Sequence, residues 1–364
     1  TTEIYTLSLH DALPISPVAR QGIDREIDGA LSRLQRRATT LGDGARYLAS
    51  AIRRATEGGK RFRPLLVVSA FETLYGDDEH RIGVYQVAAA FELLHTAFVI
   101  HDDVIDHDTE RRGVPNIGGE FRQRGLMKGA DADGSALLGD AAAILAGDLL
   151  LHEAGRMIAL AQLPDRMRQP LLEMLDDAVL ISAMGELSDV EHAVSSGEVD
   201  SEAVLRTTRD KTAAYSFSAP LQAGALIAGA PSPSIYALER FGQRLGLAYQ
   251  LVDDLIGAFG SSAVSGKEEG CDLREAKKTH LISLARKTPK WPEVSEALAQ
   301  AHTGPIAVRA AQEALSESGA RAELECLILD TLEEALIIVD SSTVPAACQD
   351  MLRDLVKAVQ ERIP

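Results

Sequence analysis

The sequence has few cysteines and a shortage of basic residues. Three cysteines among 364 residues, with no CxxC spacing, point to neither a disulfide framework nor a cysteine-ligated zinc site, and they predict a reducing, cytoplasmic environment. Lysine and arginine number 37 against 54 acidic residues, and the net charge of −17 argues against nucleic acid as a general partner. An anionic small molecule remains compatible with this charge where basic residues cluster locally.

Strand alternation is also missing, and apolar residues recur instead at three- and four-residue intervals. Hydrophobic residues make up 46% of the chain, enough for a substantial core. Helices are expected at 23–37, 45–55, 65–75, 81–106, 135–161, 166–194, 235–259 and 322–339. No break between them has the length and composition of a linker, so we predict one all-α domain over residues 17–364.

Three segments carry further expectations. The glycine-rich, charged stretch 113–134 predicts a long exposed loop. The most apolar stretch, 213–230, contains Pro220 and many small residues, which favours a buried helix pair over a membrane span. Residues 288–364 predict helices and carry no chemical motif.

The first 16 residues, TTEIYTLSLHDALPIS, do not read like the rest of the chain, which starts without Met. Written back into codons, they match a common sequencing-library adaptor. We therefore interpret residues 1–16 as an artefact, expect them to be disordered, and exclude them from the fold.

An acidic cluster ends one of the apolar runs. Asp102 and Asp106 lie four residues apart, on one face of a helix, with Asp103 beside them. Like charges at this spacing repel, and they lie where the helix dipole is already negative. A hard divalent cation such as Mg²⁺, which takes oxygen ligands and bound phosphate, is the natural compensation. A salt-bridged helix end would explain the following Arg111 and Arg112, but not three acids.

A second acidic pair and a basic segment complete the chemical pattern. Asp253 and Asp254 follow another apolar run, and Gln250 lies on the same helix face. The segment GGKRFRP, residues 58–64, places three cations behind two glycines, with Pro64 suited to open a helix. A helix N-terminus with such neighbours binds anions, and a diphosphate would suit it. Taken alone, a basic turn is more often simply solvated.

Together these motifs resemble the trans-prenyltransferases, the isoprenyl diphosphate synthase family. GGKRFRP matches the family's GGKRxRP, ELLHTAFVIHDDVIDHDTERRG its first aspartate-rich region, and QLVDDLIGAFG its second. The segments AAAILAGDLLL, GELSDV and DLREAKKT also fit, in the right order, between about residue 23 and residue 278. The resemblance implies a large all-α bundle of the isoprenoid synthase type with a central active-site cavity.

The resemblance also implies an activity, the magnesium-dependent head-to-tail condensation of isopentenyl diphosphate with an allylic diphosphate. Three Mg²⁺ ions are expected with substrate bound, held by Asp102, Asp106 and Asp253 and supported by Asp103 and Asp254.

Further positions that match the family's motifs take roles from it. The diphosphate of isopentenyl diphosphate is assigned to Lys60, Arg63, His95 and Arg112. The allylic diphosphate is assigned to Arg111, Lys211, Lys267 and Lys277, and the region where positive charge develops to Thr212 and Gln250. Taken singly, His95 would be a core histidine and each lysine a surface lysine.

Product length is expected to depend on the residues below the first aspartates. Ala97 leaves room for a growing tail, while Phe98 either forms a partial floor or is ordinary core. A medium-chain product is expected, geranylgeranyl diphosphate first, with farnesyl or longer-chain products as the alternative.

One position departs from the family pattern, because Gly257 stands where the second region commonly ends in aspartate.

Two alternative functions differ in class. A class I terpene cyclase would not need GGKRFRP, and a non-catalytic subunit of a heteromeric synthase would tend to lose the acidic clusters, which are largely kept. The family is usually homodimeric, so we also expect a homodimer.

Overall fold

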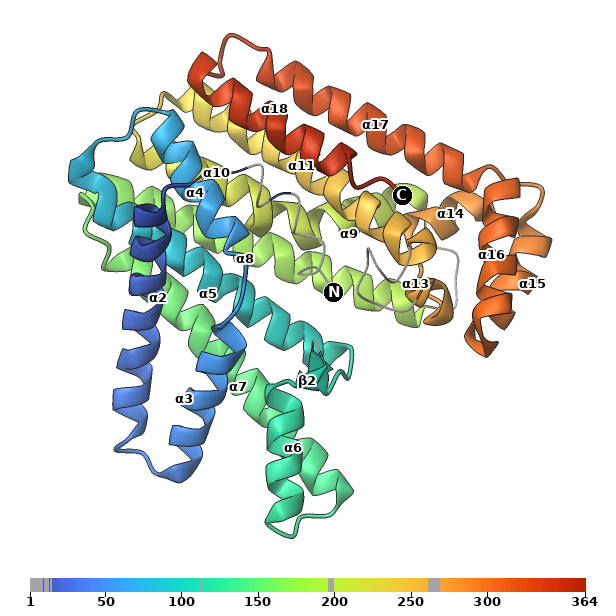
Figure 1. Cartoon of the computed structure of the whole chain (residues 1–364), viewed down its shortest axis with the longest axis horizontal. Coiled ribbons are helices and arrows are strands. Elements are labelled where there is room, and N and C mark those ends of the chain that lie inside the picture. The colour runs from blue at the N-terminus through green and yellow to red at the C-terminus, as the bar shows by residue number, and fades with distance from the viewer. Residues whose placement is uncertain (1–8, 10–12, 14, 112, 196–199, 261–268) are drawn as a thin grey trace. The chain divides into compact units, whose positions relative to one another are not determined.

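The computed structural model describes residues 9, 13, 15–111, 113–195, 200–260 and 269–364, most of them in helices (Figure 1). The predicted all-α class is confirmed. One short hairpin appears among these residues, in which β1 (Glu110–Arg111) pairs antiparallel with β2 (Val114–Pro115). The described residues form two units, 15–68 with 76–173, and 69–75 with the described part of 174–364. The expectation of a single domain stays a prediction.

The unit of residues 15–68 and 76–173 is built around one buried helix, α5. Its elements are α2 (Pro17–Ala38), α3 (Asp43–Thr56), the start of α4 (Phe62–Thr73), η2 (Asp78–His80), α5 (Arg81–Ile105), β1, β2, α6 (Ile117–Met127), α7 (Ala132–Ala159) and the start of α8 (Asp165–Val194). Helix α5 is apolar on nearly every face, and it packs against α2 and α7. A Cβ at Gly147 of α7 would overlap the ring of His101, so glycine permits this close packing.

The loop predicted for residues 113–134 is wrong. These residues contain β2 and helix α6, which packs on α7. Asn116 caps α6 by accepting a hydrogen bond from the Gly119 amide at 2.8 Å. Glycine serves here for close approach as well as for turns. A Cβ at Gly119 would overlap the carbonyl of Thr109, whereas Gly113 and Gly129 have a positive φ. Composition alone therefore gave the wrong structure.

The second unit is centred on α11. Its elements are the end of α4, the rest of α8, α9 (Ser201–Ala213), η3 (Ala214–Ser218), α10 (Ala219–Ile227), α11 (Ser232–Phe259), α13 (Cys271–Arg274), α14 (His280–Arg286), α15 (Trp291–Gln300), η4 (Ala301–Thr303), α16 (Pro305–Glu317), α17 (Ala320–Val339) and α18 (Ala346–Gln360). Helix α11 packs against α9, α10, α17 and α18, and α17 and α18 run along it in Figure 1.

The apolar stretch 213–230 forms the buried segment that was predicted. Helix α9 ends in a π-helical turn, η3, and α10 follows with Pro220 in its first turn. Proline has no N–H to donate, which accounts for the change of helix type at this point. Tyr215, Phe217 and Leu221 are all buried.

Two helical stretches in the described part are long and apolar enough to cross a membrane, Asp78–Ile105 and Ala132–Ala159. Burial accounts for the first, because 78% of its most apolar window lies inside the protein. Only 39% of the corresponding window in α7 is buried, so this helix presents an apolar surface. The expected absence of a membrane span stays a prediction.

Two residues near the start of the chain, Leu9 and Leu13, are buried. Their burial differs from the disorder expected for residues 1–16. The interpretation of this segment as an artefact stays a prediction.

Candidate active site

The first acidic cluster lies where helix α5 ends. The last helical residue is Ile105, and Asp106 is the C-cap, its amide donating to the Asp102 carbonyl at 2.8 Å. His107 then takes a left-handed conformation, with φ of 58°, and stops the helix. Asp102 is partly exposed and Asp106 is exposed, whereas Asp103 is buried. The predicted carboxylate pair is therefore accessible, with its third member turned inward.

Arg111 compensates the buried member of this cluster. Its Nε and Nη2 donate to Asp103 Oδ1 at 3.0 and 2.6 Å, and Nη2 lies 3.9 Å from Asp102 Oδ2. Burial raises the pKa of Asp103, and the hydrogen bond and charge of Arg111 oppose that rise. Strand β1 thus brings to the cluster a cation that the sequence assigned to the allylic diphosphate. Arg112 lies outside the described residues.

The basic segment 58–64 contains one arginine that the fold itself uses. Arg61 has a left-handed backbone, with φ of 58°, and its Nη1 donates to the Thr56 carbonyl and to Glu92 Oε1, both at 2.8 Å. Arg61 and Glu92 are both largely buried, which makes this ion pair a clamp between the segment and α5. The neighbouring Lys60 and Arg63 are the cations assigned to substrate.

The other residues assigned in this unit lie on α4 and α5. Arg63 is in the first turn of α4 together with Pro64, as predicted, and it is 4% exposed. His95, on α5, is 3% exposed. This burial fits a core histidine, and it equally fits a side chain that binds substrate away from bulk water. Ala97 is fully buried, and Phe98 is half-buried.

In the second unit, α9 and α11 bring together three of the predicted residues. Thr212 Oγ1 donates to Gln250 Oε1 at 3.1 Å, and Gln250 Nε2 donates to Asp254 Oδ1 at 3.3 Å. This chain of hydrogen bonds orients the amide of Gln250, because its oxygen accepts and its nitrogen donates. The sequence placed these residues in one site, and the fold joins them directly.

Lys211 is held between two acids of the GELSDV segment. Its Nζ lies 2.9 Å from Glu186 Oε2 and 2.9 Å from Asp189 Oδ2, both on α8. A Cβ at Gly185 would overlap the Lys211 backbone, so glycine lets α8 and α9 approach closely enough for these contacts. The sequence assigned no role to either acid. Lys267 lies outside the described residues.

Asp253 has a partner that the sequence did not predict. Arg362, just after α18, forms an ion pair with Asp253 Oδ1, and the two side chains are 7% and 8% exposed. The guanidinium also lies 4.3 Å from the centre of the Tyr249 ring. Residues 288–364 were expected to form helices without a chemical motif. They do form helices, and Arg362 adds to Asp253 an ion partner that this expectation did not include. Nothing in the spacing around Arg362 marks it, because helix α18 alone brings it to α11.

The second acidic pair carries strongly perturbed carboxyl groups. Burial raises the pKa of Asp253 to about 6, and the charge of Arg362 limits the rise. Burial and the nearby charge of Asp272 raise the pKa of Asp254 well above its usual range. Asp272 lies 3.5 Å from Lys277 Nζ, the lysine assigned to the allylic diphosphate. Buried carboxylates that lie close to one another favour a bound cation. Their oxygen atoms are ligands that magnesium accepts, so these residues fit that metal.

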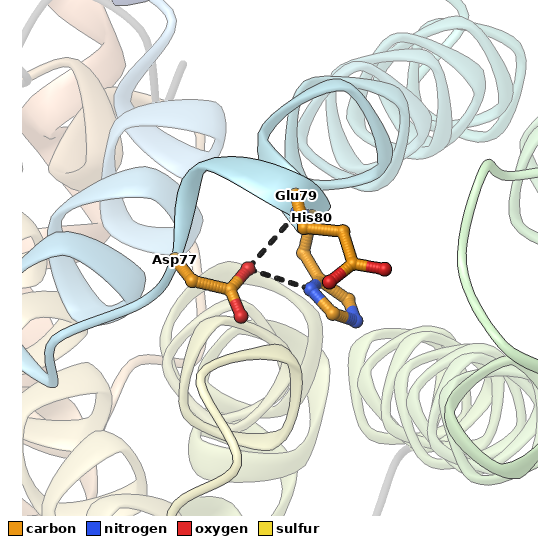
Figure 2. A group of neighbouring side chains, drawn as sticks. All are labelled: Asp77, Glu79 and His80. Atoms are coloured by element: carbon orange, nitrogen blue, oxygen red, sulfur yellow. Dashed lines mark hydrogen bonds and ion pairs between the residues drawn. The ribbon is translucent and has the colours of Figure 1, made fainter.

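Only one cluster of the described residues has three possible donor atoms already within 4.8 Å of one another: Asp77, Glu79 and His80 (Figure 2). Asp77 caps η2, accepting from the His80 amide at 3.1 Å, and its Oδ1 lies 2.7 Å from His80 Nδ1. The hydrogen bond from His80 lowers the pKa of Asp77. Local capping explains this cluster, and none of the predicted ligands belongs to it. Magnesium retains water and phosphate oxygens, so its carboxylates need not converge in advance.

The family model for polyprenyl synthetases matches residues 45–315. The chain belongs to the polyprenyl synthetase family. This polyprenyl synthetase is 33% identical over 243 residues to a geranylgeranyl diphosphate synthase of Sulfolobus acidocaldarius, covering 66% of this chain and 67% of that protein. It is 35% identical over 241 residues to a (2E,6E)-farnesyl diphosphate synthase of Mycobacterium tuberculosis, covering 64% and 60%. The alignments thus span about two thirds of these relatives.

The structure is similar to that of a geranylgeranyl pyrophosphate synthase from Corynebacterium glutamicum, complexed with isoprenyl diphosphate and magnesium. The TM-score is 0.85 at 28% sequence identity, and the match covers 96% of this chain and 100% of that chain. The predicted isoprenoid synthase fold is therefore confirmed.

The raised pKa of Asp253 predicts a pH dependence of stability. Between about pH 4 and pH 6 the folded state binds a proton at Asp253 that the unfolded chain has lost, so this group's contribution to the free energy of unfolding falls as the pH rises. A shift of two pKa units corresponds to about 3 kcal/mol. Relative to an Asp253→Asn variant, the unmodified protein should gain roughly that much stability between pH 7 and pH 4 in urea denaturation. A difference that stays constant with pH would contradict the assignment.

Proposed function

We propose that this polyprenyl synthetase catalyses the magnesium-dependent condensation of isopentenyl diphosphate with an allylic diphosphate, with geranylgeranyl diphosphate as its main product. The observation that carries this proposal is the retention, in a member of this family, of acidic pairs on both α5 and α11 together with the basic segment before α4. Relatives named as geranylgeranyl and farnesyl diphosphate synthases support the same reaction class.

Asp102, Asp106 and Asp253 are proposed to hold the magnesium ions, three in number with substrate bound. When bound, these ions supply Lewis-acid stabilisation of the diphosphate leaving group. Asp103 supports the first cluster through Arg111, which its carboxylate orients. Asp254 supports the second, held by the amide of Gln250.

The cations of the chain are proposed to bind the two diphosphates. Lys60, Arg63, His95 and Arg112 take that of isopentenyl diphosphate, while Arg111, Lys211, Lys267 and Lys277 take that of the allylic substrate. The paired acids Glu186 and Asp189 hold the Lys211 ammonium in place before substrate arrives. Fixed cations of this kind stabilise negative charge on the leaving group without reorganising during the reaction.

The carbon–oxygen bond of the allylic substrate then ionises to a carbocation, which the double bond of isopentenyl diphosphate attacks. A proton is lost from the adduct to the departing diphosphate. The oxygens of Thr212 and Gln250, joined at 3.1 Å, are proposed to face the developing positive charge. Water would quench the cation and has to be excluded. The largely apolar character of α5 and of α11 suits this requirement.

Removal of either acidic pair should abolish condensation. In Asp102→Asn or Asp253→Asn, the loss of a metal-binding carboxylate should lower the rate by at least about 100-fold. The measurement is diphosphate release with isopentenyl diphosphate, geranyl diphosphate and Mg²⁺. Asp108→Asn, which removes an exposed charge next to the first cluster, is the matched control and should keep its activity.

The same assay separates the proposed activity from its rivals. Release that requires both substrates supports condensation, while release from the allylic substrate alone identifies a cyclase or a hydrolase. A folded protein that releases no diphosphate, whether one or both substrates are present, is a non-catalytic subunit. Unchanged rates of release in both variants would refute the metal assignment.

Product length is proposed to depend on Ala97 and Phe98, below the first aspartates on α5. If Phe98 forms a floor for the growing tail, Phe98→Ala should shift the product by at least one isoprene unit toward longer chains, as read by chromatography of the dephosphorylated products. A product distribution identical to that of the unmodified protein would remove Phe98 from this role. Farnesyl diphosphate or a longer chain as the main product would correct the proposed length.

A homodimer is proposed from the surface of α7, which exposes Leu137, Ile144, Leu145 and Leu149. A second copy would cover these side chains, since several large apolar side chains exposed on one helix often mark an interface. Light scattering should give twice the chain mass, and Leu145→Lys should reduce it to that of one chain. A monomeric unmodified protein would refute the proposal.

Cytoplasmic location is proposed as well, because Cys271, Cys326 and Cys348 form no disulfide.

A further inference from the structure

Lys278 follows Lys277, the lysine assigned to the allylic diphosphate, but its ammonium group has a different use. Its Nζ donates to the carbonyls of His192, Ala193 and Ser195 at 2.9, 3.1 and 2.6 Å. An ammonium has three N–H donors, so these three carbonyls take all of them. Lys278 therefore joins two parts of the chain that lie 83 to 86 positions apart.

The three carbonyls belong to the end of α8, whose last helical residue is Val194. The last carbonyls of a helix have no amide partner within it, and they form the negative end of the helix dipole. A lysine that bonds to them caps the helix and balances that charge. Lys278 thus fixes the last turn of α8.

The same end of α8 carries the two acids that hold Lys211. Glu186 and Asp189 come six and three residues before His192, and Lys211 Nζ lies 2.9 Å from an oxygen of each. These acids keep their places only if the last two turns of the helix stay formed. The cap on α8 therefore acts, through the helix, on the position of Lys211.

The other side of this contact is the segment that carries Lys277. Helix α13 ends in two hydrogen bonds, from the Ala276 amide to the Leu273 carbonyl at 3.3 Å and from the Lys277 amide to the Asp272 carbonyl at 3.0 Å. Ala276 has a φ of 53°, which is unfavourable for a residue with a side chain and needs surrounding contacts to maintain it. The bonds of Lys278 supply such a contact, and they fix the backbone next to Lys277.

The two assigned lysines, Lys211 and Lys277, lie around one region. Asp189 is paired with Lys211, and Asp272 lies 3.5 Å from Lys277 Nζ. The negative charges of these two acids both raise the pKa of Asp254. Because such an effect weakens with distance, both acids lie close to the same carboxyl group. One ligand placed there can therefore meet both ammonium groups.

We propose that Lys278 is a positioning residue for the allylic diphosphate. By joining the end of α8 to the segment after α13, it holds Lys211 and Lys277 at a fixed separation, so that one diphosphate meets both. The inference rests on the proposed function, because it concerns the substrate of that same site. The effect should be confined to the allylic substrate, since the described cations assigned to isopentenyl diphosphate belong to the unit of residues 15–68 and 76–173.

The test measures the Kd of geranyl diphosphate with Mg²⁺ on the full chain by calorimetry, and the KM of each substrate in the condensation assay. Lys278→Met keeps the aliphatic stem and removes the donors, so the Kd and KM for geranyl diphosphate should rise about 10-fold, with the KM for isopentenyl diphosphate within about twofold. Lys278→Arg keeps the charge and several donors, and it should recover affinity to within about threefold. Lys290→Met, which removes a lysine paired with Glu317 at 3.2 Å, is the matched control and should bind as the unmodified protein does.

Each outcome bears on the inference. Unchanged affinity in Lys278→Met overturns it, as does a loss shared equally by both substrates, which would indicate a structural role alone. If Lys278→Met does not fold, Lys278→Gln, which keeps two donors without the charge, should still raise the Kd about threefold, and an unchanged Kd would contradict the proposal. An unmodified protein that binds no geranyl diphosphate overturns it too. Binding needs no turnover, so a protein whose affinity for geranyl diphosphate depends on Lys278 but which condenses nothing refutes only the proposed function.

Discussion

The constraint behind this structure is the concentration of carboxylates on two largely apolar helices. Burying a carboxylate without compensation is costly, so each buried acid must meet a cation or a hydrogen-bond donor. Arg111 meets Asp103, Arg362 meets Asp253, and Gln250 meets Asp254. These partners come from a hairpin, from the residues after α18, and from α11 itself. Each partner therefore comes from the same unit as the acid that it compensates.

Backbone strain is found close to the chemical motifs. Four described residues other than glycine have a positive φ, and three of them lie in these segments: Arg61, His107 and Ala276. Such conformations cost on the order of 1 kcal/mol each for residues with a side chain, so they persist only where surrounding contacts maintain them. Arg61 is fixed by Glu92, and His107 ends α5 within the acidic cluster. The contacts that maintain these conformations also keep the neighbouring side chains of the candidate site in defined positions.

The arginines and lysines divide into those that serve the fold and those left for ligands, and residue type alone does not separate them. In GGKRFRP, Arg61 clamps the segment to Glu92, while the adjacent Lys60 carries the proposed substrate role. Lys211, which is proposed to bind substrate, is also held by the fold, since Glu186 and Asp189 fix its position without removing its charge. If the proposed diphosphate binds here, it meets a cation whose orientation has already been set, which lowers the entropy lost on binding.

The helical class, the limits of most long helices and a candidate set of site residues could be predicted from the sequence by itself. Hydrophobic periodicity and the spacing of acids along one helix are local properties, so they can be recognised in the sequence without knowledge of contacts between helices. Only the tertiary structure decided that residues 113–134 include a packed helix, because their glycines act in contacts with distant residues such as Gly118 with Gly139. Tertiary structure likewise brings Arg362 to Asp253 and Asp272 close to Asp254. It also places Lys211 against two acids of α8. These contacts join residues far apart in the chain, and they depend on how helices pack rather than on any pattern within one of them.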